Sequence, residues 1–271
     1  KTWVDVESRP LAHLRLDMGK AEIVLKMLLE GMAINAVVRV TGVSKTAILR
    51  LIEVAGERCE QFMSETITDQ ECRDIEVDEI WGFTFCKEKH ATAQDLGPEV
   101  GDVYTFFAIE RHTKCILAVH SGRRDSASTE RFVEKLGKAV SSAATCQVNT
   151  DGFAAYGTTV WRYMGPQTSH GMVVKMFQST GKGGRYSPGE ITGIKKMSIY
   201  GNVDESKLGT SIVERANLSV RMHNRRMTRL TNAHSKKRTN HVSMLNIYFA
   251  WYNFCRKHET LENRTPAMAQ G

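Results

Sequence analysis

Three acidic residues that lie far apart in the sequence have the surroundings of a catalytic site. Asp78 lies within an apolar segment rich in β-branched and aromatic residues, which predicts a strand. Asp151 ends a second short strand that turns at Gly152, and Glu214 lies in a helix-forming stretch. An acid inside an apolar strand is costly unless it is paired. The end of a strand is where open α/β sheets place ligand chemistry.

Two aspartates on strands and one glutamate on a helix are the ligand set expected for a pair of Mg²⁺ ions. Hard divalent cations prefer oxygen ligands, and two of them about 3.5–4 Å apart can clamp both oxygens of a phosphoryl displacement. Other interpretations stay open at this point. An Asp-Gly pair is commonly only a turn. Glu214 could pair with Arg221, which lies almost two helical turns further along the same face.

The strand around Asp78 carries two further acids, Glu76 and Glu79. Because neighbouring residues on a strand point to opposite faces, only one of Asp78 and Glu79 is expected to face a metal site. Glu76 shares a face with Asp78. The alternation alone does not say which face holds the site.

The segments around these acids resemble the three acidic motifs of DDE transposases of the insertion-sequence-one type. The matching segments are Val77–Gly82, Asn149–Phe153 and Val213–Arg221. Further segments that resemble this family are Arg225–Asn232, Ser235–Lys237 and Tyr252–His258, followed by Thr265 and Pro266. The resemblance runs in order from about residue 10 to the end of the chain.

The resemblance implies a ribonuclease-H-like catalytic domain that cuts and rejoins DNA. It implies a catalytic, metal-binding triad of Asp78, Asp151 and Glu214 that holds two Mg²⁺ ions, which Mn²⁺ could replace. It selects Asp78 over Glu79 and gives Arg221 a contact with a DNA phosphate. The implied partner is double-stranded DNA, both transposon ends and target. Since two ends must be brought together, we expect a homo-oligomer that is at least a dimer.

The composition favours a polyanionic partner. The chain has a net charge of +7 and a sequence pI of about 9.1. The positive charge is densest between Arg215 and Arg238. The DNA contacts expected in this part of the chain are Arg221, Arg225, Arg226, Lys236 and Lys237.

The segment 20–56 has the outline of a helix-turn-helix. Gly42 makes the tight turn and Ser44 is a natural N-cap for the third helix. That helix would offer Lys45, Thr46 and Arg50 to the major groove. The alternative is a small helical bundle that does not read DNA.

The predicted fold is α/β, a ribonuclease-H-like mixed sheet flanked by helices, with a small amino-terminal all-α helix-turn-helix domain. Four parts are expected along the chain: an extension at 1–19, the helix-turn-helix domain at 20–56, a linker helix within 57–72, and the catalytic domain at 73–271. Strands are expected at 75–85, 103–110, 114–120, 146–151 and 172–177. Helices are expected at 127–140, 153–162, 210–221 and 242–257.

A glycine- and lysine-rich insertion is expected at 179–210, because this stretch has no regular periodicity. The run at 181–184 does not fit the spacing of a P-loop, so nucleotide binding is rejected. We expect a basic loop beside the active site. The alternative is an insertion without a role.

Several single residues have two interpretations. His120, followed by Arg123 and Arg124, could contact phosphate or be solvated. Arg256 and His258 could touch DNA or support the helix of Glu214. His223 and the aromatic residues of 242–257 are expected in the core, rather than as a metal ligand or as base-stacking platforms.

The remaining patterns exclude other classes of protein. The six cysteines show no C-x-x-C spacing, so neither a zinc ribbon nor a disulfide framework is expected. We find no membrane span and no signal peptide, and expect a cytoplasmic, nucleoid-associated bacterial protein. The first residue is Lys1 rather than Met, which suggests a missing upstream segment. The zinc-binding piece that such transposases can carry at the amino terminus is not recognisable.

The sequence therefore predicts a transposase that binds the terminal inverted repeats of its insertion element. It would catalyse metal-dependent DNA cleavage and strand transfer. The alternatives are a domesticated, non-catalytic DNA-binding protein such as a repressor, and a ribonuclease-H-type nuclease.

Overall fold

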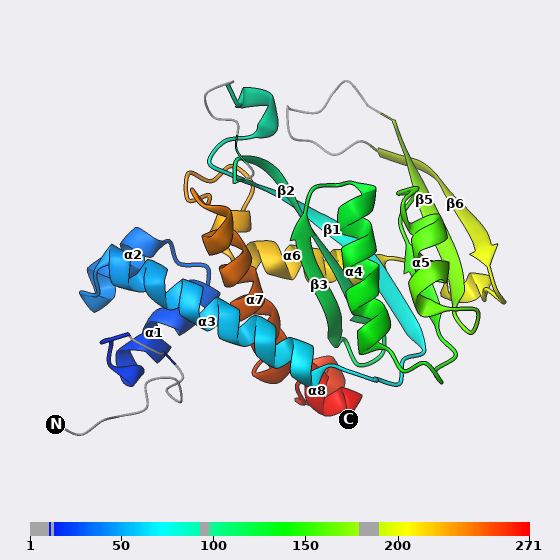
Figure 1. Cartoon of the computed structure of the whole chain (residues 1–271), viewed down its shortest axis with the longest axis horizontal. Helices are drawn as coiled ribbons and strands as arrows, with labels where there is room; N and C mark the ends of the chain where they lie inside the picture. The colour runs from blue at the N-terminus through cyan, green and yellow to red at the C-terminus, as the bar shows by residue number, and fades with distance from the viewer. Residues whose placement is uncertain (1–10, 12–13, 93–96, 98, 179–189) are drawn as a thin grey trace.

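The computed structural model describes residues 11, 14–92, 97, 99–178 and 190–271. They form a mixed sheet with helices on both faces and a group of amino-terminal helices beside it (Figure 1). This α/β arrangement confirms the expected mixed sheet and is compatible with a ribonuclease-H-like fold. Among these residues, we find no helix that combines the length and the apolar character needed to cross a membrane.

The sheet has six strands in the order β3-β2-β1-β4-β5-β6. The strands are β1 (Asp74–Thr84), β2 (Gly101–Glu110), β3 (Ile116–Gly122), β4 (Gln147–Thr150), β5 (Ser169–Gln178) and β6 (Glu190–Tyr200). Strands β1 to β3 are antiparallel neighbours, β4 runs parallel to both β1 and β5, and β6 is antiparallel to β5.

The register between β1 and β4 positions the acids. Glu76 lies opposite Asn149 in this parallel pair. Continuing that register by two residues brings Asp78 next to Asp151. Strand β4 ends at Thr150, so among the described residues β1 has no strand paired with it on this side beyond Glu76. The acids therefore lie at an open edge of β1.

Each face of the sheet has its own apolar core. Helices α4 (Ser126–Ala139) and α5 (Tyr156–Met164) cover one face, where Phe132 and Tyr156 pack against Val77 and Phe106. Helices α6 (Ser211–His223) and α7 (Arg238–Phe254) cover the other face (Figure 1). Even-numbered residues of β1 near the acids point to the α6 face, and odd-numbered ones point to the α5 face. The aromatic residues Tyr248, Phe249 and Tyr252 of α7 are buried, as expected for core residues, whereas Trp251 and Phe254 are half-buried.

The amino-terminal helices are α1 (Met18–Leu29), α2 (Ile34–Thr41) and α3 (Lys45–Thr66). Gly42 ends α2 at a φ of 69°, a left-handed conformation that glycine adopts without strain. The hydroxyl of Ser44 caps α3 by accepting a hydrogen bond of 3.3 Å from the backbone N–H of Ala47. Both local features were predicted from the sequence. DNA reading by these helices stays a prediction.

The expected separate linker helix within 57–72 is instead the second half of α3, which runs for 22 residues without a break. Helix α3 packs along α7. Gly56 of α3 allows the backbones of the two helices to approach closely. Apolar residues of α1 and α3 share one core with α6, α7 and the sheet. The boundary drawn at residue 56 therefore falls inside a helix, because packing against α7 carries the helix past it.

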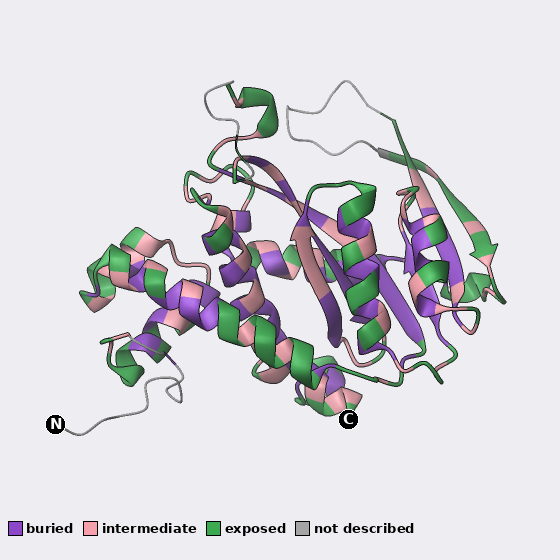
Figure 2. Cartoon of the chain, viewed as in Figure 1, coloured by how far each residue is buried: buried purple, intermediate pink, exposed green. Residues whose placement is uncertain are grey.

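The expected insertion at 179–210 also needs correction. Residues 190–200 form the edge strand β6, followed by a short 3-10 helix at Glu205–Lys207, whereas 179–189 lie outside the described residues. Figure 2 shows β6 largely exposed or half-buried. A strand that buries neither face shows no apolar alternation, so its sequence lacks the usual signal.

Candidate active site

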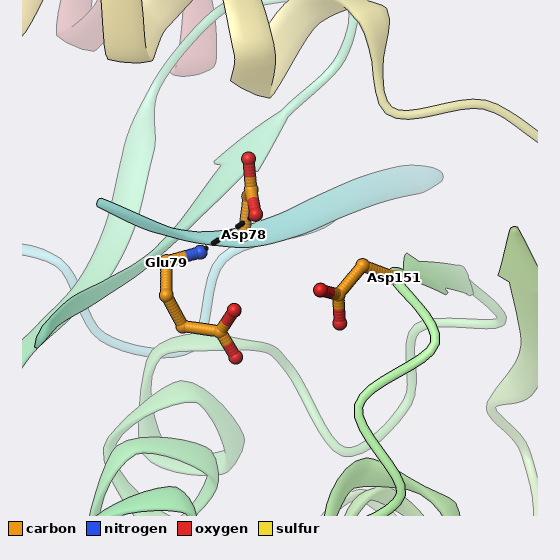
Figure 3. Close-up of side chains that lie close together, drawn as sticks. All are labelled: Asp78, Glu79 and Asp151. Carbon is orange, nitrogen blue, oxygen red and sulfur yellow. Dashed lines mark hydrogen bonds between the residues drawn. The ribbon is translucent and has the colours of Figure 1, made fainter. Parts of the chain in front are cut away.

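Three carboxylates converge at the open edge of β1. Asp78, Glu79 and Asp151 each have one oxygen within 4.8 Å of the other two. Figure 3 shows Asp78 and Glu79 leaving β1 on opposite sides, with Asp151 facing them from the end of β4. Both neighbouring acids therefore reach the site, although only one was expected to do so. The reason is that, in the part of the chain that the structure describes, no strand pairs with this edge of β1 to separate its two faces.

Asp78 is held on the α6 side of the strand. Its Oδ2 accepts a hydrogen bond of 2.7 Å from the side-chain amide of Asn217, and its Oδ1 accepts one of 2.8 Å from the backbone N–H of Glu79. Burial raises the pKa of Asp78 to about 7, and the negative charges of Asp151 and Glu214 add to this increase. A carboxylate in these surroundings is stabilised by a cation.

Glu79 is held on the α5 side. Its Oε1 accepts a hydrogen bond of 2.7 Å from the hydroxyl of Tyr156, and its Oε2 lies 3.6 Å from Nη2 of Arg124. Burial raises the pKa of Glu79 to about 7, and the charge of Asp151 adds to the increase. Its side chain is only 3% exposed. The family resemblance selected Asp78 over Glu79. The position of Glu79 next to Asp78 was the only available signal.

Asp151 shapes the turn after β4. Its Oδ1 accepts a hydrogen bond of 2.9 Å from the backbone N–H of Phe153, and its Oδ2 accepts one of 3.1 Å from Nη2 of Arg124. The guanidinium of Arg124 lies 4.2 Å from the centre of the Phe153 ring. Arg124 therefore brings a positive charge into the carboxylate group. Arg123 instead forms an ion pair of 3.1 Å with Glu88.

Glu214 lies near this group but is not part of it. Its Oε1 accepts a hydrogen bond of 2.6 Å from the hydroxyl of Thr210 and forms an ion pair with Lys175 of β5. Its charge contributes to the raised pKa of Asp78, so the two acids are close. The structure thus brings Asp78 and Asp151 together and leaves Glu214 beside them, turned toward Lys175.

Glu76 holds the helix that carries Glu214. This fully buried carboxylate accepts hydrogen bonds of 2.8 Å and 3.0 Å from the backbone N–H groups of Ile212 and Val213, in the first turn of α6. Such N–H groups have no partner within a helix, and the helix dipole favours a negative charge there. Burial raises the pKa of Glu76. Glu76 is therefore a positioning residue, a role that its face of the strand did not reveal.

Arg221 does not pair with Glu214. Its guanidinium donates hydrogen bonds of 2.8 Å to the carbonyl of Met227 and 3.3 Å to the carbonyl of Trp81. Two helical turns separate residues 214 and 221, too far for a side-chain pair. Arg221 therefore ties the end of α6 to β1, and its predicted phosphate contact stays a prediction.

A basic groove brings together two sets of predicted DNA-binding residues. The groove is a cavity of about 570 Å³. Its lining includes Lys45, Thr46 and Arg50 from α3 and Arg226, Lys236 and Lys237 from the carboxyl-terminal part. The acid Glu53 also lines it, 3.6 Å from Arg50. Arg225 does not line this groove. The packing of α3 on α7 joins these distant segments.

Arg226 has a structural role within the groove. Its Nη1 donates to the hydroxyl of Ser235 at 3.1 Å and to the carbonyl of Asn240. Burial lowers the pKa of Arg226 to about 10. The exposed side chains of Lys45, Lys236 and Lys237 are therefore the groove cations that are freest to meet a ligand.

His223 and His120 are partly buried, and the cysteines are free thiols. Nδ1 of His223 lies 2.8 Å from the carbonyl oxygen of Leu29 and links α6 to α1, and the side chain is half-buried rather than part of the core. Burial lowers the pKa of His120 to about 4. All six cysteines lie in the described part of the chain and are free thiols.

In comparisons with known proteins, the sequence matches no described family and no curated protein. A search of solved structures finds a piggyBac transposase in a synaptic complex with hairpin DNA. The two chains are 9% identical, with a TM-score of 0.43, over 93% of this chain and 68% of that one. A likeness at this level carries no functional argument.

The donor set of the site fits a hard divalent cation. Every converging ligand atom is a carboxylate oxygen, and burial makes the ionised acids costly unless a positive charge is near. Arg124 neutralises part of this charge on one side, and Lys175 does so on the other. Asp78, Glu79 and Asp151 are together placed to hold a metal ion, and Glu214 lies beside them.

Proposed function

We propose that this chain is a DNA transposase that binds the terminal inverted repeats of its insertion element and catalyses metal-dependent cleavage and strand transfer. The observation that carries the proposal is the meeting of Asp78, Glu79 and Asp151 at the open edge of a ribonuclease-H-compatible sheet. The resemblance of the surrounding segments to insertion-sequence-one transposases supports it.

Asp78 and Asp151 would hold the divalent cations, which we propose to be two Mg²⁺ ions that Mn²⁺ could replace. The resemblance names Glu214 as the third ligand, and the geometry adds Glu79 as a fourth candidate. The chemistry that bound Mg²⁺ supplies at such a site is polarisation of a phosphoryl oxygen and activation of the attacking water or 3′-hydroxyl.

The residues around the acids have distinct tasks in this proposal. Asn217 orients Asp78, Tyr156 orients Glu79, and Glu76 fixes the start of α6. Arg124 and Lys175 balance the charge of the acids and can turn to a DNA phosphate. The basic groove would hold duplex DNA through Lys45, Thr46, Arg50, Lys236 and Lys237. Arg221 and Arg225 remain proposed DNA contacts.

Synapsis of two transposon ends requires at least a dimer, and we propose a two-fold homo-oligomer for this reason. A bacterial, nucleoid-associated location in the cytoplasm follows from the same proposal. Both can be tested on the purified protein and in cells.

The test uses a labelled duplex that carries the DNA flanking the gene, incubated with the protein and Mg²⁺. The wild-type protein should cut this duplex and join it to a second duplex. Asp151→Asn should abolish both reactions and still shift the duplex in a gel. Asp69→Asn is the matched control, because Asp69 is exposed, lies away from the three acids, and has a φ of 54° that Asn tolerates.

Each outcome of this experiment corresponds to a different function. Joined products support a transposase. Products that are cut and never joined would replace it with a nuclease, and shifted, intact DNA would replace it with a non-catalytic DNA-binding protein. Full activity of Asp151→Asn would overturn the assignment of the site.

A further inference from the structure

A second basic pocket lies on the side of α6 opposite the carboxylates. The cavity measures about 330 Å³ and lies between α6 and the segment that follows α7. At about 100° per residue, Arg215 and Ser219 of the pocket point away from Glu214 and Asn217. Helix α6 therefore separates this pocket from the candidate active site. The basic groove shares no lining residue with it.

The charge of this pocket is strongly positive. Its lining includes the four cations Lys114, Arg215, Arg256 and Lys257, and the single acid Glu259. Within the described ranges, none of these four cations forms an ion pair with a carboxylate. Four cations without a carboxylate partner repel one another, and an anion between them would remove that repulsion.

Two polar groups of the pocket are buried without a hydrogen-bond partner. Among the described residues, they are Nη1 of Arg256, which lies near the hydroxyl of the buried Tyr248, and Nε2 of His258. A buried donor without an acceptor is costly, and a rotation of the side chain toward a phosphate in the pocket would give it one. Arg256 is held in place, with its guanidinium 5.6 Å from the centre of the Trp251 ring. The His258 ring packs edge-on against Tyr252 at 4.9 Å.

The environment of the pocket also changes the pKa of His258. Burial, followed by the charges of Arg256 and Lys114, lowers the pKa of His258 to about 4. The imidazole is therefore neutral near pH 7 and can offer a single N–H to an acceptor. The hydroxyl of Thr260 accepts a hydrogen bond from Nζ of Lys114 and keeps its own proton for an acceptor, whereas the hydroxyl of Ser219 donates to the carbonyl of Arg215 at 3.3 Å.

We propose that this pocket binds a phosphate of a nucleic-acid backbone, at a site separate from both the carboxylates and the basic groove. Guanidinium groups match phosphate oxygens in a fork, and lysines add charge. Because α6 has the carboxylates on one side and this pocket on the other, a strand that crosses α6 would be held on both sides of the site. This inference rests on the proposed function, since it assumes that the ligand is nucleic acid.

The test compares two double variants that remove the same charge. Arg215→Gln with Lys257→Gln removes two exposed pocket cations. Lys138→Gln with Arg162→Gln removes two exposed cations from α4 and α5. Affinity for a duplex is measured against salt concentration without Mg²⁺, so that the readout does not depend on cleavage. Equal melting temperatures show that both variants fold.

The pocket variant should bind the duplex roughly tenfold more weakly than the control. The salt slope, by which we mean the slope of log affinity for the duplex against log salt concentration, should be smaller in magnitude by about 1 to 2 in the pocket variant than in the wild type. An unchanged slope would overturn the proposal, even if the wild-type protein cuts and joins DNA. A reduced slope in a protein that never cuts DNA would support the pocket and overturn the proposed function.

A second arm uses inorganic phosphate as the probe, with chloride at equal ionic strength as the reference. If phosphate raises the melting temperature of the wild type and not of the pocket variant, while the DNA salt slopes stay equal, the pocket binds small phosphates only. That result overturns the nucleic-acid proposal. The nucleic-acid proposal is supported if phosphate raises the melting temperature of the wild type and the pocket variant also shows a reduced salt slope for duplex binding.

Discussion

The side-chain amide of Asn217 donates a hydrogen bond of 2.7 Å to Oδ2 of Asp78 and so joins helix α6 to strand β1. Asn217 lies three residues after Glu214, on the same side of the helix. The bond therefore sets the position of Asp78 relative to Glu214. A site built on two separate elements needs such a link to hold its acids in register.

Replacing Asn217 by Ala should reduce DNA cleavage more than it reduces stability. The loss of an oriented partner of a metal-binding acid typically costs about 10- to 100-fold in activity or metal affinity. The loss of one partly buried hydrogen bond costs about 1 kcal/mol of unfolding free energy. Single-turnover cleavage and urea unfolding of the same preparation measure both effects. A stability loss with normal cleavage would contradict the positioning role.

Replacing Asp78 by Asn should stabilise the protein in the absence of divalent cations, and more so at pH 8 than at pH 5. Burial raises the pKa of Asp78 from 3.8 to about 7, so the folded protein binds this proton more tightly than the unfolded chain. This tighter binding of the Asp78 proton stabilises the folded wild-type protein in full below the pKa of the unfolded chain, and the stabilisation is lost as the pH rises through about 7. Each pKa unit corresponds to about 1.4 kcal/mol.

We expect Asp78→Asn to raise the free energy of unfolding by about 2 kcal/mol at pH 8. The hydrogen bonds that the carboxylate loses offset part of the larger gain that the pKa shift alone would give. Thermal unfolding at the two pH values measures it. Adding Mg²⁺ should stabilise the wild type at pH 8 and leave Asp78→Asn nearly unchanged. Equal gains at both pH values would show that the charge of Asp78 is not the cause.

Glu76→Ala and Glu76→Gln should lower the free energy of unfolding by different amounts. Glu76→Ala removes the acceptor for the backbone N–H groups of Ile212 and Val213, and should cost about 2–3 kcal/mol of unfolding free energy. Glu76→Gln keeps an acceptor oxygen and removes a buried charge whose ion-pair partner, Arg111 at 3.8 Å, is partly exposed to solvent, so it should change the stability by less than about 1 kcal/mol. Denaturant unfolding distinguishes them. Equal losses would mean that the charge itself holds α6.

Replacing Gly56 by Ala should destabilise the protein, although Ala favours helices. A Cβ at this position would lie 2.7 Å from the carbonyl oxygen of Ser243 and even closer to its Cα. Overpacking of two helix backbones costs about 1–3 kcal/mol, which exceeds the gain in helix propensity of about 1 kcal/mol. The helices α3 and α7 would have to move apart.

Gly157→Ala is the matched control, because Gly157 lies in α5 and no atom lies within 4 Å of a Cβ placed there. It should stabilise the protein by up to about 1 kcal/mol. Melting temperatures of the two variants should therefore shift in opposite directions. Because α3 also lines the basic groove, Gly56→Ala should weaken DNA binding as well, whereas the control should not.

Much of the fold could be predicted because its signals are local. The alternation of β1, the N-cap Ser44 and the turn at Gly42 depend on residues within one or two turns of each other. The edge strand β6 could not be predicted in this way, because it buries neither face. The continuation of α3 past residue 56 was missed because its cause is packing on α7.

The sequence by itself determined which residues could do chemistry: two strand acids, a helix acid and two separate groups of cations. Only the tertiary structure decided how they combine. The parallel register of β1 and β4 places Asp78 beside Asp151, and the early end of β4 lets Glu79 join them. The packing of α3 on α7 puts Lys45 and Lys236 in one groove. Such contacts join residues far apart in the chain, so no local pattern can encode them.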